Sequence, residues 1–310
     1  MAAPAGRIVA VVGATGLQGS AVTRQLSRDG WSVRALTRNP EGKKAAPLRA
    51  LGIDVVQADS EDTRSLERAF EGASGVFTVQ NHHISGYEGE VRQGKNVADV
   101  AVRVGVPHVV YGAAGFGHRT DVGSWDTKVE ITEYMKERGV PVTVLRPMAF
   151  MELMTASKFF PPASVWHVMP KLRGDTRPVG WLAVDDLAVI VSKALADPGR
   201  FIAADLPLAA DVRSIAECRE LWRQANGRRP RRLPMPVSLF ERFVGTDETT
   251  MWRWLAAHDI DIDTQPTFDV HPEALSVPAW LSRRRKDRVR TSSETAPRMR
   301  RTVGRGDGGS

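Results

Sequence analysis

Cysteine is nearly absent from this chain of 310 residues, which contains only Cys218. A single thiol forms no disulfide within the chain, and a protein of this length buries enough apolar surface to fold without cross-links or metal staples. The sequence has no apolar run of 18 residues, and its start, MAAPAGRIV, does not place a charged segment before an apolar one. These absences exclude a disulfide-rich secreted scaffold. They predict a cytoplasmic protein with no membrane contact and no metal site.

A basic excess is present, but it lies at one end of the chain. Lys and Arg number 43 against 36 Asp and Glu, giving a net charge of +7 and an isoelectric point near 9.8. Residues 282–310 hold ten of the cations and three of the acids, so residues 1–281 carry 33 of each sign. The body shows no helix-turn-helix, zinc-finger or RNA-recognition pattern, and we expect no specific nucleic-acid partner. The tail has few large apolar residues and is expected to be disordered, although its arginines leave non-specific phosphate binding open.

Short β-branched runs alternate with helical patterns through the first half of the chain. This alternation predicts an α/β fold, a doubly wound parallel sheet of the Rossmann type. The expected strands are Arg7–Val12, Ser32–Thr37, Asp54–Ala58, Gly75–Val79, His108–Tyr111 and Val142–Leu145. The expected helices are Leu17–Asp29, a short one around Leu48–Leu51, Thr63–Phe70, Tyr87–Val104 and Lys128–Arg138.

The regular alternation stops after Pro147, where prolines interrupt the chain. Helices are expected at Asp185–Ala196 and Thr249–His258, and mostly loop at Pro266–Pro278. We therefore predict three parts: a dinucleotide-binding domain over residues 1–146, a smaller substrate-side lobe over 147–281 with contributions to the main sheet, and the basic tail over 282–310.

The segment IVAVVGATGLQGSAV joins an apolar strand to a helix through three spaced glycines. Gly13 allows the tight turn, Gly16 lets backbone N–H groups approach a pyrophosphate, and Gly19 lets the helix pack closely on the strand. The alternative is a structural turn that binds nothing. The pattern predicts a dinucleotide site that includes Gly13, Ala14, Thr15, Gly16, Leu17, Gln18 and Gly19.

The end of the second strand reads Leu36-Thr37-Arg38-Asn39-Pro40 and lacks the acid that binds the ribose 2′-hydroxyl of NAD. The guanidinium of Arg38 suits a 2′-phosphate instead, and Lys43 and Lys44 add positive charge nearby. The sequence thus predicts NADP(H) over NAD(H), the alternative being that Arg38 is an ordinary surface residue.

Further motifs, among them VRALTRNP, VVQADSED, HVVYGAAG and DTKVEITEYMKERGVPVTVLRP, make the chain similar to the NmrA-like family, an atypical branch of the short-chain dehydrogenase/reductase superfamily. The resemblance spans residues 7–281 and implies further cofactor contacts after the third strand, after the fourth strand, and near the nicotinamide. The matching positions are Asp59, Ser60, Gln80, Asn81, His82, Arg92, Ala149 and Phe150. Two alternatives stay open: Asp59 as a helix cap, and His82 and His83 as ordinary loop residues.

The same resemblance places Lys128 at the position of the lysine that holds the nicotinamide ribose, and it is our candidate catalytic residue. Four residues earlier the superfamily has a tyrosine, but this chain has Ser124, and Gly112-Ala113-Ala114 lacks the usual serine. Proton transfer would need another group: Lys128 itself, Asp126, His118, His82 or water. An apolar substrate pocket is expected from Phe116, Met148, Phe150, Met151 and Met154, although these residues could equally form ordinary core.

Two functions follow from these features. The first is an NADPH-dependent oxidoreductase that reduces a quinone-like or carbonyl compound, since the cofactor carries the difficult chemistry. The second is a non-catalytic protein that senses NADP(H) and responds by changing its protein partner. The expected partners are accordingly a small apolar substrate or a protein, with the chain a monomer or homodimer.

Overall fold

A seven-stranded parallel sheet forms the centre of the protein. The computed structural model describes residues 6–295, and for residues 288–295 only the backbone. The strand order is β3-β2-β1-β4-β5-β6-β9, and every adjacent pair is parallel. The strands are β1 (Ile8–Val11), β2 (Ser32–Thr37), β3 (Asp54–Gln57), β4 (Ala73–Thr78), β5 (Val109–Gly112), β6 (Val142–Pro147) and β9 (Asp205–Leu208). The predicted doubly wound fold is confirmed.

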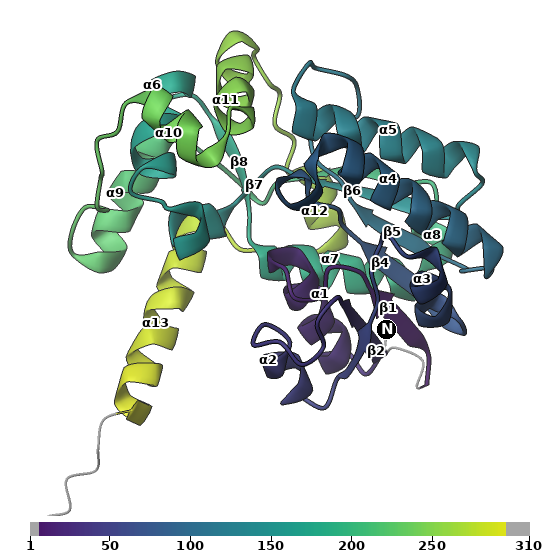
Figure 1. Cartoon of the computed structure of the whole chain (residues 1–310). Helices are drawn as coiled ribbons and strands as arrows, with labels where there is room; N and C mark the ends of the chain where they lie inside the picture. Colours follow the sequence, from purple (N-terminus) through teal and green to yellow (C-terminus); the bar gives the residue numbers. More distant parts are fainter. Residues whose placement is uncertain (1–5, 296–310) are drawn as a thin grey trace, which may run out of the picture.

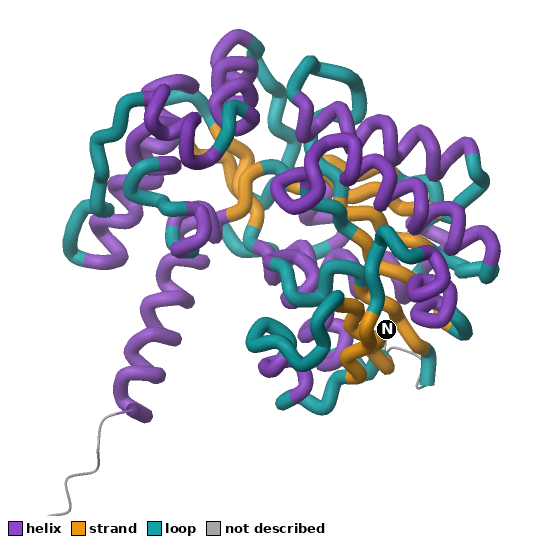
Figure 2. Tube along the Cα trace, viewed as in Figure 1, coloured by secondary structure: helices purple, strands orange, loops and turns teal. Residues whose placement is uncertain are grey.

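Helices cover both faces of this sheet, as Figures 1 and 2 show. One face packs on α1 (Leu17–Arg28) and α7 (Val184–Ala196), with buried contacts such as Val22 and Leu187. The other packs on α3 (Thr63–Phe70), α4 (His82–Arg103) and α5 (Gly123–Glu137), with Phe70, Val97 and Ile131 in its core. The strands are short apolar runs because both of their faces are buried.

The second lobe has its own core around a three-stranded sheet of order β10-β8-β7. Its strands are β7 (Ala149–Phe150), β8 (Val179–Leu182) and β10 (Asp211–Arg213). Buried tryptophans at 166, 181, 252 and 280 fill this core. The surrounding helices are η1 (Met151–Met154), η2 (Ser157–Phe159), η3 (Ser164–Val168), α6 (Met169–Arg173), α9 (Ile215–Asn226), α10 (Val237–Val244), α11 (Asp247–Ala257) and α13 (Val277–Thr295).

The chain leaves the main sheet at Pro147 and returns to it twice. Helix α7, the short α8 (Pro198–Phe201) and strand β9 complete one edge of the sheet, and α12 (Gln265–Val270) packs beside β9 and α7. The remaining short helix, α2 (Ala46–Arg49), follows β2. The second lobe is therefore discontinuous in sequence. Residues 148–183 and 209–264 lie beyond the carboxyl ends of the parallel strands (Figure 1), and α13 returns to the same lobe after α12.

Two sequence expectations about the C-terminal third are wrong. Residues 265–270 form α12 rather than loop, because Pro266 suits the first turn of a helix and Thr267 and Val270 are buried. Residues 282–295 are helical rather than disordered. They continue α13, whose first turns are anchored in the lobe core by Val277, Trp280 and Leu281, and an anchored helix propagates easily through Arg and Lys. The rest of the predicted tail, 296–310, lies outside the described residues.

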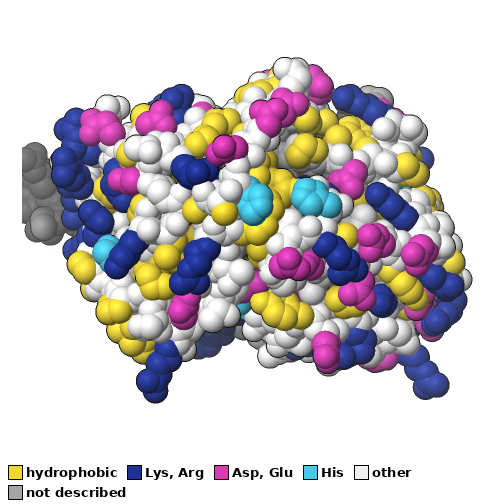
Figure 3. Space-filling model, turned by 90° about the horizontal axis from the view of Figure 1, so that it is seen from above, with side chains coloured by type: hydrophobic (Ala, Val, Ile, Leu, Met, Phe, Trp, Pro, Cys, Tyr) yellow, Lys and Arg dark blue, Asp and Glu magenta, His cyan; other side chains and the backbone are white. Residues whose placement is uncertain are grey.

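No helix in the described part of the chain is both long enough and apolar enough to cross a membrane. The surface seen from above mixes the two signs of charge over most of its area (Figure 3). Histidine side chains lie near the middle of this face, between the two halves of the molecule, next to hydrophobic and acidic side chains (Figure 3).

Candidate functional site

The loop between β1 and α1 has the geometry that a pyrophosphate needs. Gly13 has a φ of +71°, and its carbonyl accepts a hydrogen bond of 2.9 Å from the Gly16 N–H. A Cβ at Gly19 would lie 2.2 Å from that carbonyl oxygen, so only glycine fits. Helix α1 begins after Gly16 with no side-chain cap and no acid in its first turn. Its first N–H groups and its dipole therefore remain available for an anion.

Three buried side-chain atoms around this edge of the sheet have no hydrogen-bond partner within the described part of the chain. They are Gln18 Oε1 at the start of α1, Gln80 Oε1 after β4, and His82 Nε2 in the first turn of α4. A buried polar atom without a partner costs about 1–3 kcal/mol. Their convergence at the carboxyl end of β1 and β4, where the strand order reverses, fits a bound dinucleotide.

The residues after β2 form a cationic loop. Arg38, Lys43 and Lys44 are exposed, and among residues 6–295 the Arg38 guanidinium has no hydrogen-bond or ion-pair partner. A fourth cation lies near this loop, from the other lobe. Lys158 of η2 is exposed as a residue, but the partial burial of its ammonium and the charge of Lys44 lower its pKa. Such a cluster suits a phosphate.

The residues after β3 are tied to the protein more tightly. Asp59 Oδ1 accepts from the Glu61 N–H at 3.0 Å, while Asp62 caps α3, so the capping alternative for Asp59 is wrong. The carbonyl of Ser60 accepts from Asn96. Arg92 forms a bidentate pair with Glu61, at 2.7 and 3.0 Å. The structure thus places the Arg92 side chain on the outer surface of α4, in contact with the chain's own carboxylate.

Lys128 lies in a buried polar network. Its ammonium forms an ion pair with Glu90 and donates to the Gln80 carbonyl at 3.0 Å, and Thr127 Oγ1 donates to the other Glu90 oxygen at 2.5 Å. Burial lowers the pKa of Lys128, and the Glu90 carboxylate opposes that change. Lys128 therefore holds the backbone of the loop after β4.

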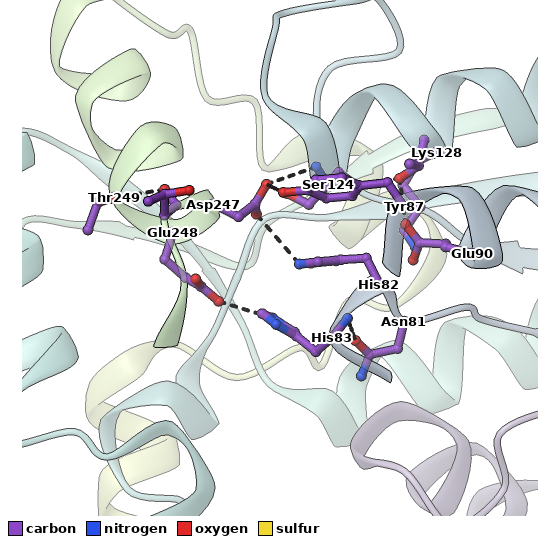
Figure 4. Close-up of polar contacts among 12 residues, drawn as sticks. Asn81, His82, His83, Tyr87, Glu90, Ser124, Lys128, Asp247, Glu248 and Thr249 are labelled. Atoms are coloured by element: carbon purple, nitrogen blue, oxygen red, sulfur yellow. Dashed lines mark hydrogen bonds and ion pairs between the residues drawn. The ribbon is translucent and has the colours of Figure 1, made fainter. Parts of the chain in front are cut away.

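A second cluster joins the two lobes over this loop (Figure 4). His82 and His83 begin α4, which Asn81 caps with its side chain. His82 Nε2 lies 3.7 Å from Asp247 Oδ2, and His83 Nε2 lies 3.0 Å from Glu248 Oε1. Both carboxylates stand in the first turn of α11, where the helix dipole favours them.

Tyr87 completes this cluster. Its hydroxyl donates to Asp247 Oδ1 at 2.8 Å, and the N–H of Ser124 donates to the same oxygen at 3.0 Å. The Tyr87 ring stacks on His82 with centroids 5.2 Å apart, and it lies so close to Gly123 that a Cβ there would be 2.6 Å from it. Gly86, with a φ of +71°, provides the kink in α4 that turns the chain here.

The two histidines differ in their proton affinity. Burial and the neighbouring His83 lower the pKa of His82, while Asp247 and Glu90 act in the opposite direction. The hydrogen bond to Glu248 raises the pKa of His83. One ring thus favours its neutral form and the other its protonated form.

Aromatic residues make a further contact between the lobes. Phe116, from the loop after β5, stacks on Trp254 of α11 at 5.4 Å, and Trp125 of α5 meets both rings edge-on. Trp254 in turn stacks on His258 at 3.9 Å. Asp247 and Trp254 are seven residues apart, so one face of α11 makes both contacts.

The predicted apolar pocket is only partly supported. Met151 and Met154 are buried in the lobe core, at 0 and 1% exposure, so their assignment to the pocket is wrong. They pack there because η1 turns inward after β7. Met148, Ala149 and Phe150 are half-buried at the junction of the two cores. Phe116 lies in the aromatic contact described above.

Two of the candidate proton donors lie elsewhere. The Asp126 carboxylate accepts from the N–H groups of Thr120 and Asp121, at 2.7 and 3.1 Å, and so fixes the loop before α5. His118 is exposed on that loop. Among the candidate proton donors, only His82 both follows β4 in the chain and has a carboxylate, that of Asp247, facing its ring.

The sequence patterns did not indicate several residues of this site: Glu90, Tyr87, Asp247, Glu248 and Lys158. Glu90 lies on an otherwise apolar face of α4, which is the signal that could have identified it. Asp247 and Glu248 each lie 165 residues from the histidine that they face, and no local sequence pattern indicates such a pairing.

The NmrA-like family model matches residues 6–275. An NmrA-like family domain-containing oxidoreductase of Aspergillus japonicus is 30% identical over 247 residues, which cover 73% of this chain and 75% of the relative. Another, from Aspergillus campestris, is 28% identical over 302 residues and 88% of each chain.

Solved structures share the fold. The negative transcriptional regulator NmrA in complex with NADP has a TM-score of 0.71 at 18% identity, covering 94% of this chain and 98% of its own. The triphenylmethane reductase of Citrobacter sp. complexed with NADP(H) has a TM-score of 0.72 at 17% identity, covering 90 and 99%. An NADPH-dependent quinone oxidoreductase of Escherichia coli has 0.66 at 20% identity, covering 89 and 98%.

Proposed function

Because the chain belongs to the NmrA-like family, we propose that it binds NADP(H) and uses it to reduce a small quinone-like or carbonyl compound. One observation carries this proposal. The glycine loop presents the uncapped start of α1, and the unpartnered atoms of Gln18, Gln80 and His82 surround the same edge of the sheet. A dinucleotide would supply partners for the side-chain oxygens of Gln18 and Gln80, while His82 Nε2 is directed at Asp247.

Each part of the site has a distinct task in this proposal. The N–H groups at the start of α1 hold the pyrophosphate, and Arg38, with the cations near it, holds the 2′-phosphate. Asp59 and Ser60 lie beside the adenine, and Ala149 and Phe150 beside the nicotinamide. When bound, the reduced nicotinamide supplies the hydride.

Lys128 acts indirectly in this scheme. Its ammonium has a third N–H beyond the Glu90 and Gln80 contacts, but its main effect is to fix the carbonyl of Gln80 and the loop that carries His82. We assign the proton for the substrate oxygen to His82, because its ring lies after β4 and faces the carboxylate of Asp247.

The substrate class rests on the absence of the superfamily's serine and tyrosine and on the relatives. Quinones and similar acceptors take up hydride without a strong enzymic acid. Solved structures of the same fold include a quinone oxidoreductase and a triphenylmethane reductase, both named for substrates with unsaturated rings. Phe116 and Trp254 offer aromatic surface beside the site.

Two measurements test the proposal. Purified protein is titrated with NADPH and NADH, and NADPH oxidation is then followed with a panel of quinones, aldehydes and ketones. We expect tighter binding of NADPH and turnover with at least one acceptor. The variant Arg38→Asp should lose the preference for NADPH, whereas Arg64→Asp, an exposed arginine on α3, should keep it. An Arg38→Asp protein that still prefers NADPH would reject the cofactor assignment.

A second function is favoured by the missing serine and tyrosine together with the similarity to NmrA, a negative transcriptional regulator. In this alternative the protein binds NADP(H) without turnover and changes its association with a protein partner. Tight NADPH binding without oxidation across the whole acceptor panel would favour it over the enzyme.

A further inference from the structure

The carboxylate of Asp247 is held from several sides by the opposite lobe. Oδ1 accepts hydrogen bonds from the Tyr87 hydroxyl and the Ser124 N–H, at 2.8 and 3.0 Å. Oδ2 faces His82 Nε2 at 3.7 Å (Figure 4). The side chain of Asp247 is only 9% exposed. A carboxylate with two fixed donors on one oxygen presents the other oxygen in a defined direction, here toward His82.

The distance between Asp247 and His82 is longer than a hydrogen bond, which ends near 3.2 Å. Contacts between catalytic groups are often long without substrate and shorten when the site closes. Nothing else in the described chain bonds to His82 Nε2, and the atom is shielded from solvent. Protonation of the ring would therefore create a donor whose acceptor already faces it.

We propose that Asp247 is a positioning residue for His82: from the first turn of α11 it fixes the ring and stabilises its protonated form. This inference rests on the proposed function, because it gives His82 the role of proton donor. It adds a residue of α11 in the second lobe to a proton donor that comes from α4 in the dinucleotide-binding half.

The reaction balances with His82 in this role. The bound reduced nicotinamide would supply a hydride to the carbonyl carbon of the substrate, and the electron pair of the C–O π bond would move to oxygen. That oxygen takes the proton from His82 Nδ1, because Nε2 is turned to Asp247. The N–H bonding pair stays with the imidazole, which regains a proton from water. The carbonyl is reduced and the nicotinamide is oxidised.

Several charged or titratable groups act on His82. Helix α4 contributes His83, at 4.0 Å between ring centroids, with Tyr87 and Glu90. Helix α5 contributes Lys128, and α11 contributes Asp247 and, beside it, Glu248. The charges of Glu90 and Lys128 oppose each other in their ion pair. Asp247 is thus the acid whose removal should change the proton affinity of His82 most.

The first test needs no substrate. The ring resonances of His82 are identified by their loss in His82→Gln and are titrated by NMR in the full-length wild type and in variants. We expect Asp247→Asn to lower the pKa of His82 by about one unit, the lower end of the effect of an adjacent opposite charge. Asp247→Glu, which keeps the charge, should restore most of that difference.

The matched control is Glu248→Gln, which removes the neighbouring carboxylate of the same helix turn. Glu248 pairs with His83, so this variant should lower the pKa of His83, and it should not lower that of His82, because a less protonated His83 repels the charged His82 ring less. An equal His82 pKa in the wild type and in a folded Asp247→Asn protein overturns the inference.

If Asp247→Asn does not fold, Tyr87→Phe provides the test. This variant removes one hydrogen-bond donor to the Asp247 carboxylate and should lower the pKa of His82 by a smaller amount. An unchanged value in Tyr87→Phe then overturns the inference.

The second test uses turnover with an acceptor that the wild type reduces. In Asp247→Asn we expect kcat to fall by about tenfold to a hundredfold, with little change in KM or NADPH affinity. The pH above which kcat declines should also move lower. Turnover equal to wild type at every pH overturns this inference but leaves the proposed reductase intact. A wild type that binds NADPH and reduces nothing overturns the reductase, and the donor role of His82 with it.

Discussion

The ammonium of Lys128 and the carboxylate of Glu90 form a buried ion pair beneath the loop that follows β4. Their side chains are 8 and 0% exposed, and the ammonium also binds the carbonyl of Gln80. This placement makes the lysine a support of the loop after β4. The family resemblance alone had suggested a side chain directed at the ribose.

Removal of one partner of this pair should destabilise the folded protein, because the charge of the other partner remains buried without a counter-charge. We expect Glu90→Ala and Lys128→Met each to lower the free energy of unfolding by about 3–5 kcal/mol. The double variant Glu90→Leu/Lys128→Met should be less destabilised than the sum of the two, because no charge is left unpaired. Urea denaturation followed by circular dichroism measures all three.

The pair formed by Lys95 and Glu130, 2.7 Å apart on the surface of α4 and α5, serves as the control. Its side chains are more than a third exposed, so Lys95→Met should cost well under about 1 kcal/mol. If Lys128→Met costs no more than Lys95→Met, the network does not support the loop.

Gly19→Ala should impair cofactor binding. The new Cβ would lie 2.2 Å from the carbonyl oxygen of Gly13, and backbone must move to relieve the contact. Overpacking of this kind costs about 1–3 kcal/mol, so we expect at least about a fivefold loss of NADPH affinity in a fluorescence titration. Gly199→Ala, where the nearest atom is 3.9 Å away, should bind NADPH as the wild type does. Normal binding by Gly19→Ala would show that the loop does not need its glycine.

The first half of the fold could be predicted because local patterns determine it. Strands that are buried on both faces, such as Ile8–Val11, read as short apolar runs bounded by glycines. Strand β9 was missed: it lies at the edge of the sheet, is partly exposed and contains Pro207, which only an edge position tolerates. The fold of the second lobe is harder to predict from the sequence, because its short strands and proline-rich turns show no clear hydrophobic periodicity.

The site divides in the same way. Its phosphate end follows from Gly13, Gly16 and Gly19, which are close in sequence and whose spacing has a physical cause. Its proposed catalytic end depends on α11, which brings Asp247 beside His82 through tertiary packing. No rule of spacing connects these two residues. The burial of Lys128 likewise depends on Glu90 of a neighbouring helix.

The contact of α11 with His83 should weaken as the pH rises. Glu248 raises the pKa of His83 above its ordinary value near 6.5, so the protonated ring is favoured in the folded protein. This contribution is complete below about pH 6.5 and is lost as the pH rises through the higher folded-state pKa. Hydrogen exchange of the α11 amides, corrected for intrinsic rates, should therefore speed up from about pH 6.5 upward.

The variant Glu248→Gln should remove most of this pH dependence. Glu241→Gln is the matched control: Glu241 also contacts α11, through Thr249 and Arg253, but it pairs with no histidine there. It should leave the pH dependence as in the wild type. A dependence that persists in Glu248→Gln would assign it to another group, with His82 the first to examine.

Lys158→Gln should weaken NADPH binding and spare NADH. Lys158 comes from the second lobe, and its proximity to Lys44 places two like charges at the loop that carries Arg38. Such a pair is unfavourable by itself and becomes favourable when a phosphate lies between the two cations. Because the side chain is exposed, we expect a loss of about 1 kcal/mol, or about fivefold in NADPH affinity, that shrinks at high salt.

The control is Lys171→Gln, which changes an exposed lysine on α6 and should bind both cofactors as the wild type does. If the variant lost the same affinity for NADPH and NADH, Lys158 would contact a part of the cofactor other than the 2′-phosphate. If it lost no affinity for either, Lys158 would not contact the cofactor.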